Sequence, residues 1–319
     1  MSIMPEIQRA AAELEAPPPT IEADLADQGL ELLRPDRKGG VLRYMRRNPS
    51  LPIGILLILS LLLFSLIGSL VWEVNHYRPL SVRALQPPSW TLPFGSDRQG
   101  RDLFATMIAG TPLTLRIGLI AGFIGVGVGT ILGFISAYYG GFVDYLIRGL
   151  VDIGLTVPGL LVLIIIAVTI RTAITVDQLA LVVACLAWLF PARTIRAQVL
   201  TMRERAWVQI ARLSGMRGSE IIVKEMLPNL FPYLAAALVT SISSAILASI
   251  GLEALGLGEI DSPTLGMTVY WVLFNAALIN GWWWWWAPPI TILAILFIGL
   301  FLVSIGLDEI ANPRLRRAV

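Results

Sequence analysis

The sequence has very little of what catalytic and metal sites are made from. It contains one cysteine, Cys185, and one histidine, His76, so neither an intrachain disulfide nor a cluster of histidine and cysteine ligands can form. It also lacks a G-x-x-x-x-G-K-[ST] phosphate-binding loop, an H-E-x-x-H pair and a G-x-S-x-G nucleophile turn. We therefore predict that the chain is not an enzyme, binds no cofactor or metal of its own and does not hydrolyse ATP. Cys185 lies in an apolar run, which predicts a buried thiol, and His76 is expected in a surface loop.

Charge is scarce as well. Charged residues make up 14% of the 319 residues, against about 25% in soluble domains, whereas 56% are hydrophobic. The mean hydropathy is +0.74. The formal net charge of +2 comes from arginines in loops rather than from one basic domain, so nothing indicates a nucleic-acid partner. The sequence predicts an integral protein of the lipid bilayer.

The sequence contains enough long apolar runs for a helical protein that crosses the membrane several times. A membrane-spanning helix requires about 20 apolar residues. The sequence predicts an all-α fold with six such helices, over 51–72, 111–139, 142–170, 176–200, 227–250 and 288–307. The predicted parts are a cytoplasmic tail with a basic juxtamembrane segment (1–50), the first helix (51–72), an extracytoplasmic segment (73–110), a core of five helices (111–307) that includes a cytoplasmic loop (201–228), and a cytoplasmic tail (308–319).

Basic residues indicate which side of the membrane each loop occupies. Six of them lie between Arg34 and Arg47, directly before the first apolar run, and the 201–228 loop is also rich in arginine. Loops with an excess of positive charge stay in the cytoplasm. We expect both termini and the 201–228 loop on that side, and no cleavable signal peptide, since the first apolar run begins far from the N-terminus.

The segment from Trp207 to Pro228 is polar and basic although it joins two long apolar runs. Small or apolar residues recur in it at the spacing of a short helix, namely Trp207, Ile210, Ala211 and Ser214. Gly215 is expected to end this helix in the left-handed conformation. A second helical run leads to the Leu-Pro pair that closes the segment, where proline suits the first turn of the next helix. The pattern predicts a rigid helix–glycine–helix elbow.

Glycines in the second predicted span have the spacing of packed membrane helices. Gly125, Gly129 and Gly133 are four residues apart, and Gly118 and Gly122 form a second such pair. Small residues at this spacing allow helix backbones to approach closely in lipid. We expect these glycines to pack against other helices of the same chain.

Charges and a proline mark the third predicted span. Asp144, Arg148 and Asp152 are four residues apart, so opposite charges can pair on one helix face. A proton relay is the alternative interpretation. Pro158 is expected to kink the helix.

Five consecutive tryptophans, Trp282 to Trp286, precede the sixth predicted span. Indole rings favour the membrane–water interface, which predicts an interfacial anchor on the outer side. An aromatic platform for a sugar-like ligand or for a binding protein is the alternative.

The predicted extracytoplasmic segment contains the sequence FGSDRQGRD, residues 94–102. Its glycines allow tight turns, and its aspartates and arginine can pair or cap the helix that follows. A structural role is expected, with solute contact as the alternative. This segment resembles the G-T-D-x-x-G-R-D signature of the dipeptide, oligopeptide and nickel branch of ABC importer permeases. The matching residues are Gly95, Asp97, Gly100, Arg101 and Asp102.

The elbow resembles the EAA loop of the same family, in which Glu-Ala-Ala is followed by a glycine and then, at a fixed interval, by Leu-Pro. The corresponding positions are Gln209, Ile210, Ala211, Gly215, Leu227 and Pro228. The usual glutamate is Gln209 here, and the first alanine is Ile210. Further matches are the A-R-x-x-R-x-x-V-L pattern at 192–200 and the L-G-L-G run at 255–258. The family usually has a serine where this chain has Glu253.

The resemblance implies a type I ABC importer permease fold and a set of partners. These are a second homologous permease subunit, two cytoplasmic ATPase subunits that use ATP and Mg, and an extracytoplasmic solute-binding protein. It places the chain in the cytoplasmic (inner) membrane of a bacterium or archaeon. It also implies contact with the ATPase through the elbow, at Trp207, Gln209, Ile210, Ala211, Leu213, Gly215, Leu227 and Pro228.

The residues do not identify the solute. Within this branch of the family, di- or oligopeptides are the expected cargo, with nickel and oligosaccharides as alternatives carried by the same type of permease. A secondary transporter is the alternative from another class, but it would need ion sites at mid-membrane, and the predicted spans have few ionisable residues away from their ends. An intramembrane enzyme would need a catalytic constellation, and none is visible.

Overall fold

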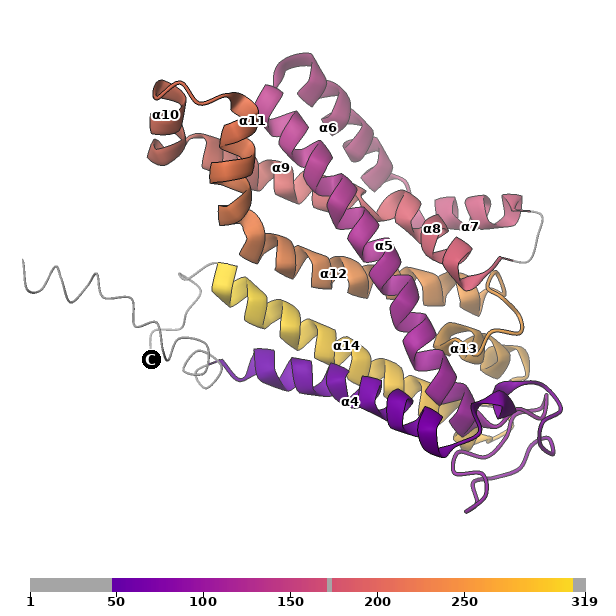
Figure 1. The fold of residues 1–319 in the computed structure, drawn as a ribbon. Coiled ribbons are helices and arrows are strands. Elements are labelled where there is room, and N and C mark those ends of the chain that lie inside the picture. The colour runs from indigo at the N-terminus through magenta and orange to yellow at the C-terminus, as the bar shows by residue number, and fades with distance from the viewer. Residues whose placement is uncertain (1–47, 171–173, 312–319) are drawn as a thin grey trace, which may run out of the picture. The chain divides into compact units, whose positions relative to one another are not determined.

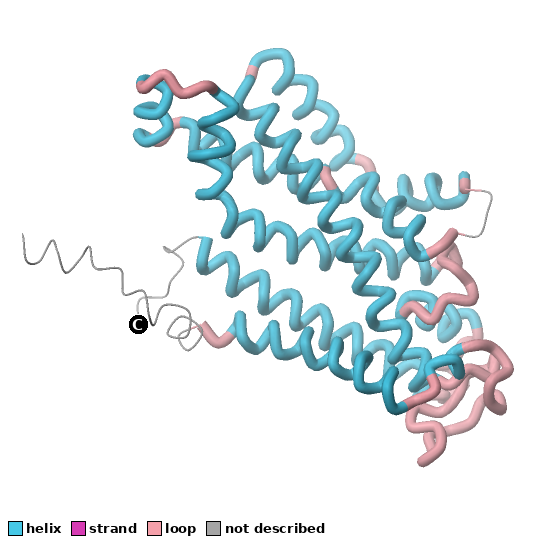
Figure 2. The backbone as a smooth tube through the Cα atoms, viewed as in Figure 1, coloured by secondary structure: helices cyan, strands magenta, loops and turns pink. Residues whose placement is uncertain are grey.

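The computed structural model describes residues 48–170 and 174–311. Most of the predicted N-terminal tail (residues 1–47) and residues 312–319 of the C-terminal tail lie outside the described residues. The described part is helical and contains no strand; its one bridge pairs Ser96 with Asp102. The predicted all-α class is confirmed (Figures 1 and 2). The helices are α4 (Ser50–Val71), η1 (Val74–Tyr77), α5 (Leu103–Tyr139), α6 (Gly141–Thr156), α7 (Gly159–Thr169), α8 (Val176–Ala187), α9 (Leu189–Arg203), α10 (Ala206–Leu213), α11 (Gly218–Glu220), the π-helical η2 (Ile221–Met226), α12 (Leu227–Ala254), α13 (Leu265–Phe274) and α14 (Trp283–Ala311).

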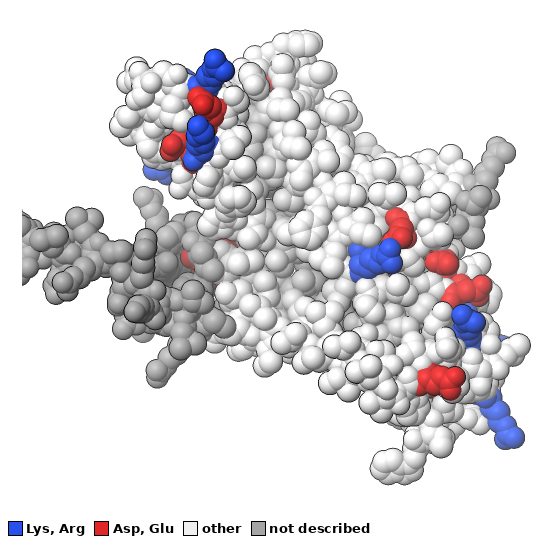
Figure 3. Space-filling model, in the orientation of Figure 1, with Lys and Arg blue, Asp and Glu red and all other residues white. Residues whose placement is uncertain are grey.

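Six membrane spans are found if each of two bent helix pairs counts as one span. The four unbroken spans are α4, α5, the continuous helix Gly218–Ala254 and Trp283–Glu309 of α14. α5 begins at Leu103, eight residues before the predicted start of the span at Thr111. The fifth span does not begin afresh at Leu227-Pro228, because α11, η2 and α12 run on as one helix. Between the elbow and the opposite end, the visible surface is almost free of charge (Figure 3).

The third and fourth spans are both broken. α6 and α7 meet at 89°, so Pro158, which lacks a backbone N–H, ends one helix rather than merely kinking it. α8 and α9 are bent by 41° at Trp188, which the sequence did not predict. Non-helical backbone at membrane depth needs protein or water around it, so both breaks indicate a cavity or a packed interior nearby.

α5 is the helix on which the other spans pack, and its glycines make this possible. A Cβ added at Gly122 would lie 2.6 Å from a side-chain carbon of Ile242 on α12. A Cβ added at Gly129 would lie 2.7 Å from Pro191 on α9. The predicted packing of these glycines within the chain is confirmed, with one pair against α12 and the triplet against the region of α8 and α9.

α4 and α14 lie side by side along their length (Figure 1). A Cβ added at Gly54 would come within 2.7 Å of the backbone of Gly299 and Val303. The Ser65 hydroxyl donates a 2.6 Å hydrogen bond to the Ile108 carbonyl, which joins α4 to α5. Cys185, predicted to be buried, is exposed on α8, because the opposite face of that helix packs in the core.

Candidate functional site

The elbow, from Trp207 to Pro228, begins within α10, one side of which is firmly packed. Val208 is 0% exposed and Ala211 is 8% exposed. They belong to one apolar cluster with residues of α5, α9, η2 and α12, among them Phe134, Ile195, Val199, Ile221, Met226 and Leu230. Trp207 is half-buried against the same cluster. This packing fixes α10 to four other helices.

The other side of α10 is exposed and apolar. Leu213 is 88% exposed and Ile210 is 62% exposed, and their i, i+3 spacing places them on one face. Of the four residues at helical spacing, Trp207 and Ala211 pack against the chain, whereas Ile210 and Ser214 are exposed. Figure 1 shows α10 at the edge of the described structure, whereas α11 is the first turn of the continuous helix Gly218–Ala254.

Gly215 ends α10 as predicted. Its φ is +81°, a conformation that favours glycine. The Gly215 N–H donates to the Arg212 carbonyl at 3.1 Å, and the Met216 N–H donates to the Ala211 carbonyl at 3.2 Å. These two bonds are the Schellman arrangement, which satisfies the last carbonyls of a helix. The turn at the centre of the elbow is thus defined by backbone geometry.

Gln209, which stands at the usual glutamate position, points back into the chain. It is half-buried, and its Nε2 donates a 3.1 Å hydrogen bond to the Arg203 carbonyl at the end of α9. Arg203 in turn donates to the Ala137 carbonyl of α5 at 3.2 Å. At the start of α12, Leu227 is half-buried and Pro228 is exposed. The amide of Gln209 therefore holds α10 to α9.

The second arm of the elbow touches the end of α5. A Cβ added at Gly218 would lie 2.7 Å from the Tyr138 ring. On the same arm, Lys224 Nζ lies 3.4 Å from Glu220 Oε1. Because α5 begins directly after the 94–102 segment, this one helix runs from that segment to the elbow.

Residues 94–102 form a buried turn, which we call the glycine–aspartate turn. Gly95 and Gly100 have φ of +70° and +72°, as their predicted role in tight turns requires. Asp97 and Arg101 are 2% and 4% exposed, and Asp97 Oδ1 accepts a 2.8 Å hydrogen bond from the Arg101 N–H. Asp102 caps α5 by accepting from the Phe104 N–H at 2.9 Å. The expected structural role is supported, since little of the turn is open to a solute.

The Asp97–Arg101 pair is loose and buried. Arg101 Nε lies 3.9 Å from Asp97 Oδ2. Burial raises the pKa of Asp97 to about 6, against hydrogen bonds from the backbone and the charge of Arg101, which lower it. Burial also lowers the pKa of Arg101. The guanidinium lies 5.3 Å from the centre of the Trp271 ring, a cation–π contact that offsets part of the lost hydration.

The tryptophan run packs largely inside the chain. Trp283 to Trp286 form the first turn of α14 rather than preceding it. Trp285 is 0% exposed, whereas Trp283 is 56% exposed. Trp284 Nε1 donates to the Ser96 carbonyl at 3.4 Å. The tryptophans therefore pack against the glycine–aspartate turn and stabilise it. Among the five, only Trp283 has an indole exposed enough to act as an interfacial anchor.

Charges near the start of α6 pair between helices rather than along one helix. Asp144 accepts two hydrogen bonds from Arg196 of α9, at 2.5 and 2.7 Å, and a third from the Ser136 hydroxyl. Arg148 and Asp152 are exposed. Asp144 therefore pairs with Arg196 of another helix and not with Arg148 at the predicted i, i+4 spacing. The planar guanidinium of Arg196 can bond to both carboxylate oxygens of Asp144.

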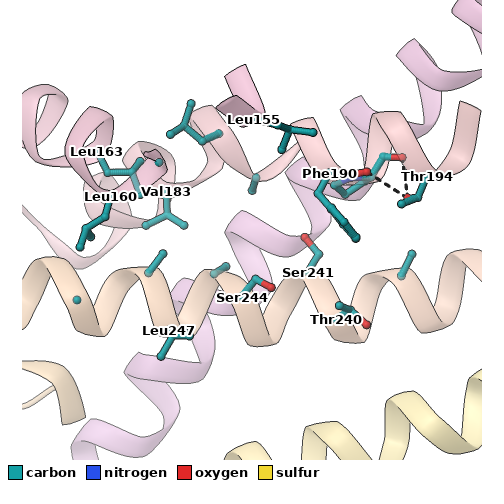
Figure 4. Close-up of a pocket in the computed structure, with 18 of the residues that line it drawn as sticks. Leu155, Leu160, Leu163, Val183, Phe190, Thr194, Thr240, Ser241, Ser244 and Leu247 are labelled. Atoms are coloured by element: carbon teal, nitrogen blue, oxygen red, sulfur yellow. Dashed lines mark hydrogen bonds between the residues drawn. The ribbon is translucent and has the colours of Figure 1, made fainter. Parts of the chain in front are cut away.

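A groove of about 800 Å³ lies between α12 and the broken spans (Figure 4). Ser241 projects from α12 toward Phe190 of α9, with Leu160, Leu163 and Val183 along the opposite wall. No motif in the sequence predicts this groove. Its signal in the sequence is a group of small and hydroxyl-bearing residues inside an apolar span, namely Thr240, Ser241, Ser243, Ser244 and Ala245.

The carboxylate of Glu253 is buried, which the sequence pattern does not predict. It is 1% exposed, and one of its oxygens accepts from the Thr264 hydroxyl, which joins the last turn of α12 to the start of α13. Gly266 leaves room for its other oxygen. The serine usual in the family could not fill this space.

Six apolar spans, a groove beside two broken helices and an elbow with a free apolar face define a polytopic α-helical transport protein. Residues 129–317, more than half of the chain, match the family described as "Binding-protein-dependent transport system inner membrane component". The chain belongs to this family. It is therefore a transport permease subunit of the inner membrane, with several spans, and not an enzyme. The resemblance seen in the sequence is confirmed.

Similar proteins cover most of the chain. The oligopeptide transport system permease protein OppC of Mycobacterium tuberculosis is 29% identical over 74% of this chain and 81% of its own. OppC of Bacillus subtilis is 26% identical over 88% of this chain and 90% of its own. The dipeptide transport system permease protein DppC of Bacillus subtilis is 28% identical over 86% of this chain and 85% of its own.

Proposed function

We propose that this chain is one of two membrane subunits of an ATP-driven importer for di- or oligopeptides. Its partners are a second permease of the same fold, two ATPase subunits that bind ATP and Mg, and a solute-binding protein on the opposite side of the membrane. The names of the similar proteins support peptides as the cargo, whereas nickel and oligosaccharides remain the alternatives within the family branch.

One observation carries the proposal. α10 is packed on one side by Val208 and Ala211 and exposes Ile210 and Leu213 on the other. Exposed apolar side chains on a rigid helix are the features of a surface that a partner covers. α10 is the coupling helix in this proposal, and Ile210 and Leu213 insert into the ATPase.

The packing of the elbow explains how a push on α10 would reach the spans. The shared cluster joins α10 to α5, α9 and α12, and Gln209 and Arg203 tie it further to α9 and α5. Movement of α10 with the ATPase would therefore shift these helices together. ATP can drive transport only if the ATPase binds the inward- and outward-open states unequally, and the elbow is the place where that difference is applied.

The test is a substitution of Leu213, whose side chain has few internal contacts to lose. In Leu213→Asp we expect normal membrane insertion but at least a tenfold loss of co-purifying ATPase and of ATP-driven peptide uptake in proteoliposomes. Trp90→Asp is the control, because Trp90 is 101% exposed and lies before the glycine–aspartate turn, far along the chain from the elbow. It should retain the ATPase. Full uptake by Leu213→Asp, or uptake by this chain without any ATPase, would refute the proposal.

A further inference from the structure

α6, the first half of the broken third span, has few contacts with the rest of the chain. It follows α5 at the elbow end of that helix and lies beside α5 and α9 (Figure 1). Of its 16 residues only Val151 is buried, in a small apolar cluster with Leu189 and Ala192 of α9. No described residue of α6 belongs to the apolar cluster of the elbow. Movement of α10 must therefore reach α6 through a neighbouring helix.

α9 contacts both the elbow and α6, through two adjoining faces. Ile195 and Val199 are 0% exposed and belong to the elbow cluster. Leu189, Ala192 and Arg196 lie three and four residues apart, which places them on the other face, and all three contact α6. Rigid secondary elements can carry coupling between distant sites. A displacement of α9 at the elbow would therefore also displace the residues that hold α6.

The contact between Arg196 and Asp144 is the most specific of these. Nε and Nη2 of Arg196 donate to the two carboxylate oxygens at 2.5 and 2.7 Å, and the Ser136 hydroxyl of α5 donates to one of them at 2.5 Å. No other ion pair among the described residues is as short. The side chains of Arg196 and Asp144 are 21% and 20% exposed. Those of Arg116 and Asp177, which pair at 2.8 Å, are 56% and 54% exposed, and such exposed pairs contribute little.

We propose that Arg196 and Asp144 are positioning residues through which movement of α9 reaches the broken third span. The inference rests on the proposed function and adds the link to α6 that the elbow cluster lacks. Two parallel hydrogen bonds fix the orientation of a guanidinium against a carboxylate, so α6 follows α9 in rotation as well as in translation. α6 ends at the 89° break before α7. A shift of α6 therefore acts directly on this break.

The test measures how much of a labelled tripeptide is transported per ATP hydrolysed in proteoliposomes that contain the full complex. In Arg196→Gln and in Asp144→Asn, transport per ATP should fall at least tenfold. The co-purifying ATPase should be unchanged, because the elbow keeps its packing. Arg196→Lys keeps the charge but not the bidentate geometry, and we expect a loss of about threefold. Arg148→Gln is the control, since Arg148 lies one turn after Asp144 and is exposed; it should keep the wild-type ratio.

Exchange of the two charges separates transmission from folding. In the double variant Asp144→Arg with Arg196→Asp, the same pair can form in reverse, and the Ser136 hydroxyl can accept a hydrogen bond instead of donating one. We expect transport per ATP to recover to at least a third of the wild-type value. Recovery should be incomplete, because position 144 is in the first turn of α6, where the helix dipole disfavours a positive charge.

Three results would overturn the inference. A wild-type ratio in Arg196→Gln would show that α6 moves without the pair. Absence of recovery in the double variant would show that the pair itself is not the link. Parallel loss of the ATPase and of thermal stability in both Arg196→Gln and Arg196→Lys would assign the pair a purely structural role. If the proposed function fails, Leu213→Asp retains full uptake, whereas failure of this link alone leaves the loss in Leu213→Asp intact, so the two failures are distinguishable.

Discussion

At the scale of single residues, the glycine–aspartate turn shows how a sequence motif can be structural without being exposed. Asp97 accepts a hydrogen bond from the Arg101 N–H, and Asp102 accepts one from the Phe104 N–H and another, at 2.6 Å, from the Trp72 indole. The turn therefore joins the end of α4 to the start of α5. Burial raises the pKa of the Asp97 carboxylate in this turn.

We predict that stability depends on pH through Asp97. Its pKa is about 6 when folded, against an ordinary 3.8. The folded chain therefore binds a proton more tightly than the unfolded chain, and stability should rise as the pH falls from about 7 to 4. The difference corresponds to roughly 3 kcal/mol at 1.36 kcal/mol per pKa unit. Chemical unfolding in detergent between pH 4 and 8 measures it.

Asp97→Asn is the matched variant, since an amide oxygen can still accept from the Arg101 N–H but does not titrate. The difference in stability between wild type and Asp97→Asn should shrink as the pH falls through 6. A difference that stays constant over this range would show that Asp97 is not the responsible group.

At the scale of elements, close helix packing depends on particular glycines of α5. A Cβ at Gly129 would lie 2.7 Å from Pro191 and 2.8 Å from the Ala192 nitrogen on α9, whereas a Cβ at Gly127 would meet nothing within 4 Å. We predict that Gly129→Ala destabilises the protein by about 1–3 kcal/mol, because α9 must move away. Gly127→Ala should be neutral or slightly stabilising, since alanine favours the helix.

Thermal unfolding of both variants in the same detergent measures the effect of each substitution on stability. A lower midpoint for Gly129→Ala alone is expected. Equal midpoints would mean that α5 and α9 do not approach as closely as their backbones indicate.

Much of this level of structure could be predicted from the sequence. The apolar runs predicted the spans, the spacing of the glycines predicted their packing, and Gly215 predicted the end of α10. The breaks were harder, because Pro158 marks only one of them and Trp188 gives no local signal for the other. The burial of Trp285 depends on contacts distant in sequence, with Leu103 and with Phe94 of the glycine–aspartate turn. The inward orientation of Gln209 depends on the geometry with which α10 follows α9, which brings its amide to the Arg203 carbonyl. The groove could not be predicted because residues of six helices, α6, α7, α8, α9, α12 and α14, form it together.

At the scale of the whole molecule, α5 connects two ends with different surfaces. The elbow exposes apolar side chains beside basic residues, and the glycine–aspartate turn is buried beneath the 73–93 segment and the tryptophans. If the elbow meets an ATPase that uses cytoplasmic ATP, the 73–93 segment must lie on the other side of the membrane. The arginines of the 201–228 loop favour the same orientation.

We therefore predict opposite accessibility for two exposed positions. In a Cys185→Ala background, Trp90→Cys and Leu213→Cys place single thiols at residues that are 101% and 88% exposed. A membrane-impermeant maleimide should label Trp90→Cys in intact spheroplasts and Leu213→Cys only after the membrane is opened. The ATPase should then protect Leu213→Cys, because the proposed coupling contact covers it, and should leave Trp90→Cys unchanged. Labelling of Leu213→Cys in intact spheroplasts would place the elbow outside, beyond the reach of cytoplasmic ATP, and a coupling role for α10 would be untenable.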